Sequence, residues 1–158
     1  MLFLVLEDDA VKSLLKAGRI VSRVLDYASR YVQPGVKILS ICEVLEGLIY
    51  EWGGVPAFPC NVSVNYIAAH YTSPVGDTSV IPDGAVVKVD VGAHVDGYIA
   101  DAARTLSFDH RYDDLVEAVD VALETAISLI RPGVSVKSIS KEIEHAIRGF
   151  GFKPISNL

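Results

Sequence analysis

The stretch KVDVGAHVDGYIADAART, residues 88–105, decides the fold that this sequence predicts. It contains two alternating apolar runs around Asp96-Gly97, and this dipeptide is the strongest short-range signal for a two-residue type I′ hairpin turn. Two aspartates, Asp90 and Asp101, interrupt the apolar runs. A carboxylate that is desolvated and alone in a strand costs several kcal/mol, so each aspartate needs a hydrogen-bond, ionic or metal partner.

The turn also fixes the register of the hairpin, because Val95 and Tyr98 must form the first opposed pair. Asp101 then lies opposite Gly92 and diagonal to Asp90, with backbones roughly 7–8 Å apart and both side chains on one face. The other face is wholly apolar and is expected to pack on helices; it carries Val87, Val89, Val91, Ala93, Val95, Tyr98, Ala100 and Ala102.

Three interpretations of the paired aspartates follow from their spacing. Two carboxylates that converge on one point repel unless a cation lies between them, and such oxygen ligands are typical of a dinuclear hydrolytic metal site. Alternatively, both are solvated surface groups, or one of them is paired with Lys88 or Arg104. His94 lies on the same face, but a histidine at a strand end beside a turn is more often exposed than a metal ligand.

The composition narrows the class of protein. The chain has 158 residues, of which 51% are hydrophobic, and this indicates one domain with a sizeable core. A net charge of −6 with scattered Lys and Arg argues against a nucleic-acid partner. Cys42 and Cys60 are too few for a disulfide framework, so we expect a reducing cytoplasm. We interpret the N-terminal LFLVL as a packing or strand segment, and no apolar run approaches the ~20 residues that span a membrane.

The periodicity predicts the order helix, helix, sheet, helix, helix, and hence an α/β (α+β) fold with an antiparallel sheet. Helices are expected at residues 9–32, capped by Asp8 or Asp9, and at 38–52. Short strand-like runs divided by turns fill residues 57–108. Helical periodicity returns at residues 113–130 and 136–148.

An internal repeat relates residues 34–60 to residues 132–158 without a gap. Nine aligned positions are identical, where chance would give roughly two; they are Pro34/Pro132, Gly35/Gly133, Val36/Val134, Ser40/Ser138, Ile41/Ile139, Glu46/Glu144, Ile49/Ile147, Gly53/Gly151 and Pro56/Pro154. The alternative explanation is that any two amphipathic helices preceded by Pro-Gly look alike. If the repeat is real, the sequence corresponds to the first half of a larger repeating unit.

Three segments carry a resemblance to a known family: AFPCNVSVNYIAAHYTSPVGDTSV (57–80), KVDVGAHVDGYIADAARTLSF (88–108) and GFKPISNL (151–158). With them the chain resembles the methionine aminopeptidases of the pita-bread fold, the type II and archaeal enzymes more than type I. The resemblance implies a partial metalloaminopeptidase domain over residues 1–158, with the second pseudo-symmetric half truncated.

The resemblance also assigns expected roles to individual residues. Asp90 and Asp101 correspond to two of five ligands for two divalent ions (Co, Mn, Fe or Zn), with Asp101 bridging both. His70, which by itself could equally be a core histidine, corresponds to the histidine that contacts substrate near the scissile bond. The wall of the methionine pocket corresponds to Phe58, Pro59 and Asn61. The remaining ligands, one histidine and two glutamates, belong to the second half, so this chain alone is expected to be incomplete for catalysis.

The implied function is dinuclear-metal hydrolysis that removes the initiator methionine from nascent polypeptides in the cytoplasm. A prolidase or proline aminopeptidase of the same fold is one alternative, and a catalytically silent binding protein is another. The full-length protein is expected to be a monomer without nucleic-acid or membrane partners. The 158-residue chain is expected to expose apolar surface and to self-associate.

Overall fold

The computed structural model describes residues 6–155, so most of the LFLVL segment lies outside the described residues. Contacts divide the chain into two compact units, one that ends at Phe108 and one that begins at Asp109. The predicted single domain over residues 1–158 stays a prediction. The first unit contains α1 (Asp8–Tyr31), α2 (Ile38–Glu51), β1 (Val55–Pro56), β2 (Asn61–Val64), β3 (Val86–Val95) and β4 (Tyr98–Ser107).

Helix α1 confirms the first predicted helix and differs from the prediction at its start. Glu7 is the N-cap residue and makes no side-chain cap, whereas Asp8 and Asp9 occupy the first turn. There their negative charges interact favourably with the positive end of the helix dipole. The helical periodicity places Val11 and Leu15 on the apolar stripe of α1, but both are exposed, and the continuous buried face begins near the middle of the helix.

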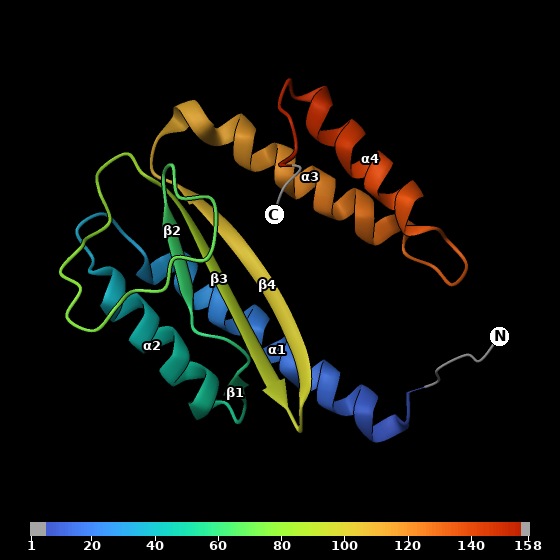
Figure 1. Cartoon of the computed structure of the whole chain (residues 1–158), viewed down its shortest axis with the longest axis horizontal. Coiled ribbons are helices and arrows are strands. Elements are labelled where there is room, and N and C mark those ends of the chain that lie inside the picture. The colour runs from blue at the N-terminus through green and yellow to red at the C-terminus, as the bar shows by residue number, and fades with distance from the viewer. Residues whose placement is uncertain (1–5, 156–158) are drawn as a thin grey trace. The chain divides into compact units, whose positions relative to one another are not determined.

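Strand β3 is the centre of the four-stranded antiparallel sheet (Figure 1). Strands β1 and β2 pair with different parts of one edge of β3, and β4 pairs along the whole of the other edge. The predicted hairpin register is confirmed, since Val95 pairs with Tyr98 and Gly92 with Asp101. The turn residues Asp96 and Gly97 both have positive φ, 52° and 84°, as a type I′ turn requires.

The helix-covered face of the sheet forms the core of the first unit. Helix α1 packs on β3 and β4, while α2 packs on β1 and β2. The buried residues of β3 on this face are Val87, Val89, Val91 and Ala93. Complete burial of one such valine contributes about 1.5–3 kcal/mol. The expectation for β4 was partly wrong, because Tyr98 and Ala102 are exposed, whereas Ala100 between them is half-buried against the core.

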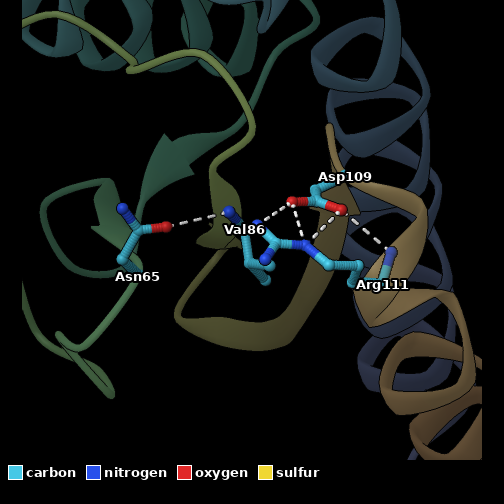
Figure 2. Close-up of polar contacts among 4 residues, drawn as sticks. All are labelled: Asn65, Val86, Asp109 and Arg111. Carbon is cyan, nitrogen blue, oxygen red and sulfur yellow. Dashed lines mark hydrogen bonds and ion pairs between the residues drawn. The ribbon is translucent and has the colours of Figure 1, made fainter.

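The second unit contains η1 (His110–Tyr112), α3 (Asp113–Leu129) and α4 (Val136–Gly149). Asp109 is the first residue of this unit. Its carboxylate accepts hydrogen bonds from Arg111, whose Nη2 lies 2.6 Å from Asp109 Oδ2 (Figure 2). Both helices agree with the predicted ranges. Helix α4 begins and ends 98 residues after α2, which is the spacing of the sequence repeat.

Both copies of the Pro-Gly loop also share their backbone conformation. Gly35 and Gly133 have φ of 84° and 89°, and Gly53 and Gly151, which follow α2 and α4, have φ of 80° and 83°. Residues 156–158 of the predicted repeat lie outside the described residues. Within residues 6–155, no helix is both long enough and apolar enough to cross a membrane.

Candidate metal centre

Asp90 and Asp101 lie on the same face of the β3–β4 hairpin, as the register predicted. Gly92 pairs with Asp101, and Asp90 is two residues from Gly92 on the same strand, so the two aspartates are diagonal neighbours. Diagonal neighbours in an antiparallel pair lie within reach of each other's side chains. Asp101 is exposed and Asp90 is half-buried, on the face opposite the helices.

The pKa of Asp90 is affected by the neighbouring carboxylate of Asp101. Burial raises the pKa of Asp90, and the neighbouring negative charge and hydrogen bonding of Asp101 raise it further. A hydrogen bond from Asn61 and the charge of His70 act in the opposite direction on this pKa. The site therefore disfavours two bare carboxylates and would gain free energy from a bound cation.

The alternative interpretation through a salt bridge is wrong for both candidate partners. Arg104 extends to the helix-covered face, where its Nη1 lies 2.9 Å from Asp26 Oδ1 and 2.9 Å from Ser29 Oγ. Lys88 Nζ donates to the carbonyl of Asn65 at 3.4 Å. The side chains of Arg104 and Lys88 therefore bind other groups instead of the two aspartates.

Phe58 lies against the same face of the sheet. Its ring occupies the space where a side chain at position 92 would begin, since a Cβ built on Gly92 would meet Phe58 Cε1 at 2.3 Å. Glycine at position 92 thus allows the ring to lie directly on β3, on the residue that pairs with Asp101. Phe58 is half-buried and the adjacent Pro59 is exposed, so an apolar surface adjoins the aspartates.

Asn61 begins β2 and pairs with Asp90 across the sheet. Its side chain is buried, and its Oδ1 accepts a hydrogen bond from Thr72 Oγ1 at 2.9 Å. Directly opposed residues in an antiparallel sheet project to the same face, so Asn61 belongs to the aspartate face. The sequence placed Asn61 in this region by resemblance alone, and it assigned no role to Thr72.

His70 lies on the long segment between β2 and β3. It is exposed, and the alternative that it is a core histidine is therefore wrong. Its backbone has φ of 63°, in the left-handed region that non-glycine residues rarely adopt. Such strained conformations persist only where surrounding contacts hold them, and they cluster at functional sites.

The segment that carries His70 is held at both sides. Before it, Asn65 Oδ1 accepts a hydrogen bond from Val86 N at 3.0 Å (Figure 2). After it, Asp77 accepts hydrogen bonds from Ser73 Oγ at 2.7 Å and Tyr71 Oη at 3.1 Å. Asp77 lies within residues 57–80, which carry the family resemblance, but the sequence gave no means of predicting these hydrogen bonds.

The remaining histidines are placed away from the aspartates or in local contacts. His94 Nδ1 accepts a hydrogen bond from Gly97 N at 3.3 Å, so it supports the hairpin turn. His110 Nδ1 lies 2.9 Å from Asp113 Oδ2, and His145 lies near Glu142 in α4.

Asp90 and Asp101 offer carboxylate oxygens, which hard divalent cations prefer as ligands. The negative charge of Asp101 raises the pKa of Asp90, so a cation bound by both carboxylates would relieve their repulsion. Within residues 6–155, however, no three or more His, Cys, Asp or Glu side chains are grouped so that they could hold a metal ion. The two aspartates thus form a partial set of ligands.

Comparison of the sequence with family models and curated proteins identifies related proteins. The model of metallopeptidase family M24 matches residues 12–157. The chain is 50% identical over 150 residues to the methionine aminopeptidase of Thermococcus onnurineus, covering 95% of this chain and 51% of that protein. It is 46% identical over 153 residues to that of Methanocaldococcus jannaschii, covering 97% and 52%. The chain thus spans about half the length of the curated relatives it matches.

Solved structures agree with this fold. Methionine aminopeptidase from Thermotoga maritima matches with a TM-score of 0.90 and 27% identity over 99% of this chain and 66% of that chain. The X-Pro aminopeptidase of the same organism matches with a TM-score of 0.77 and 24% identity, over 94% and 43%, and shares the fold. The fold, the aspartate face and the match along almost the whole sequence show that the chain belongs to metallopeptidase family M24.

Proposed function

We propose that this chain provides part of the active site of a methionine aminopeptidase, which removes the N-terminal methionine from nascent polypeptides. The observation that carries the proposal is the convergence of Asp90 and Asp101 beside the ring of Phe58 on one face of the sheet. The curated relatives named methionine aminopeptidase, at 46–50% identity, support this substrate class.

In this proposal each residue has a separate task. Asp90 and Asp101 would hold the divalent ions, which when bound supply Lewis acidity toward the scissile carbonyl. Phe58, Pro59 and Asn61 would receive the methionine side chain, and Phe58 offers it an apolar ring next to the carboxylates. His70, on the exposed segment, would donate or accept a hydrogen bond at the scissile peptide. A cytoplasmic location stays a prediction from the cysteine content.

The test compares Asp101→Ala with Asp96→Asn in the protein expressed from its complete gene. We expect Asp101→Ala to abolish Mn²⁺-dependent release of methionine from a Met-Ala peptide without changing the circular dichroism spectrum, because it removes one cation ligand. Asp96→Asn should be nearly silent, since asparagine also suits the left-handed turn position and can still accept the bond from Ser13 Oγ.

The choice of substrates distinguishes the alternatives. Cleavage of an Xaa-Pro peptide in preference to Met-Ala would indicate a prolidase-like enzyme, and no cleavage of either peptide by the metal-loaded protein would indicate a silent relative. Equal losses of activity in the two variants would contradict the assignment of Asp101.

A further inference from the structure

The side chain of Asn61 is held by a hydrogen bond from a residue outside the aspartate pair. The residue is only 8% exposed, and its Oδ1 accepts the hydroxyl hydrogen of Thr72 at 2.9 Å. Thr72 is 11 residues away in sequence and lies on the segment that carries His70. Because the Thr72 hydroxyl donates its hydrogen, the oxygen end of the Asn61 amide faces Thr72.

The orientation of the amide matters because its two ends have opposite chemistry. The oxygen only accepts hydrogen bonds and the nitrogen only donates them, while an ionised carboxylate only accepts. With its oxygen committed to Thr72, Asn61 presents its nitrogen to Asp90, which it faces directly across β2 and β3. The reverse orientation would direct the amide oxygen at a carboxylate that Asp101 already repels.

Thr72 is itself fixed by its two chain neighbours. The carbonyl of Tyr71 accepts a hydrogen bond from Val62 N at 2.9 Å, which joins this segment to β2. Ser73 Oγ donates to Asp77 Oδ2 at 2.7 Å. The hydroxyl of Thr72 is thus delivered to Asn61 from a backbone held on both sides.

We propose that Thr72 is a positioning residue whose hydroxyl orients the Asn61 amide and thereby fixes the Asp90 carboxylate to receive a divalent cation. The inference rests on the proposed function insofar as the aspartates bind metal. Groups that orient a metal ligand through hydrogen bonds typically change metal affinity by about 10–100-fold when removed.

The experiment compares Thr72→Val, which removes the hydroxyl at nearly constant shape, with Thr72→Ser, which keeps it. Thr78→Val is the matched control, because Thr78 is an exposed threonine on the same segment. Mn²⁺ affinity is measured by calorimetry on the protein from the complete gene, and the side-chain NH₂ resonances of Asn61 are followed by NMR without metal.

We expect Thr72→Val to weaken Mn²⁺ binding by about tenfold or more and to shift the Asn61 NH₂ resonances. Thr72→Ser should restore both, and Thr78→Val should change neither. Unchanged affinity in Thr72→Val, or an equal loss in Thr72→Ser, would overturn the proposal.

One further variant separates this inference from the proposed function. Asp101→Asn removes a negative charge from the site itself, so it should abolish Mn²⁺ binding if the aspartates form the metal centre. Binding that survives Asp101→Asn contradicts the metal centre and with it the role of Thr72. Binding lost in Asp101→Asn but unchanged in Thr72→Val contradicts the role of Thr72 alone.

Discussion

At the scale of single residues, Gly92 controls the contact between the apolar ring and the carboxylate face. A Cβ at this position would lie 2.3 Å from Phe58 Cε1 and 2.9 Å from Cδ1 and Cζ, so the ring must move in Gly92→Ala. We expect a loss of about 1–3 kcal/mol in the free energy of unfolding, as for other overpacked positions. Urea unfolding followed by Trp52 fluorescence measures it.

The control for this substitution is Gly47→Ala in α2. A Cβ on Gly47 meets no heavy atom within 4 Å, and alanine in a helix is favoured over glycine by about 1 kcal/mol. Gly47→Ala should therefore stabilise the protein. If Gly92→Ala were equally harmless, the ring would not be held against β3 as described.

Asp77 gives the first unit a predictable response to acid. Hydrogen bonds from Ser79, first, and from Ser73 and Tyr71 hold its pKa well below the ordinary value of 3.8. Because the folded pKa is the lower one, the stabilisation is complete above the unfolded value and is lost as the pH falls through the folded pKa. The amide proton resonance of Ser79, which donates to Asp77 Oδ1 at 2.8 Å, reports this loss.

The expected result is a Ser79 resonance that stays constant down to pH 3.8 and shifts only at lower pH. Asp77→Asn should remove this titration, because an amide does not ionise in this range. A midpoint at or above the ordinary aspartate value in the unchanged chain would show that the carboxylate is not clamped.

At the scale of elements, α2 and α4 offer a comparison inside one chain. Ile41 in α2 is fully buried beneath the sheet, whereas Ile139, 98 residues later in α4, is half-buried and lines an open cavity of about 500 Å³ between α3 and α4. We expect Ile41→Ala to cost about 2–5 kcal/mol in unfolding free energy and Ile139→Ala distinctly less. Chemical denaturation followed at 222 nm measures both.

Equal costs at the two positions would mean that α4 is packed as tightly as α2. The reason for expecting a difference is the packing of each helix. Helix α1 and strands β1 and β2 cover α2, while among the described residues α4 packs chiefly with α3. The same local pattern of apolar residues thus has different energetic consequences in the two units.

At the scale of the whole molecule, α3 and its C-cap residue expose an apolar stripe formed by Val119, Leu123, Ile127 and Ile130, each 49–65% exposed. Contiguous apolar surface of this kind promotes association. We expect the 158-residue chain to self-associate, and the double variant Leu123→Glu/Ile127→Glu to shift it toward the monomer. Light scattering across a concentration series measures the mass.

The control for association is Tyr66→Glu, at an isolated apolar residue that is 95% exposed on the segment before His70. It should leave the mass unchanged. A chain that is monomeric at all concentrations, or that associates equally in the Leu123→Glu/Ile127→Glu variant, would contradict the role of the stripe.

The sequence by itself determined the features that depend on local interactions. The turn at Asp96-Gly97 set the register of β3 and β4, and with it the shared face of Asp90 and Asp101. Apolar periodicity gave the four long helices within one or two residues, because each helix buries one stripe of its own side chains. Burial was less predictable, since Val11 and Leu15 continue the stripe of α1 but are exposed.

The tertiary structure alone decided which distant residues meet the aspartates. Asn61 reaches Asp90 because β2 pairs with β3 across a segment of irregular structure, and no local pattern specifies that pairing. The ring of Phe58 on Gly92 and the hydroxyl of Thr72 on Asn61 likewise depend on how loops fold back over the sheet. Such contacts arise from the packing of the whole unit, whereas turns and helix stripes are encoded within a few neighbouring residues.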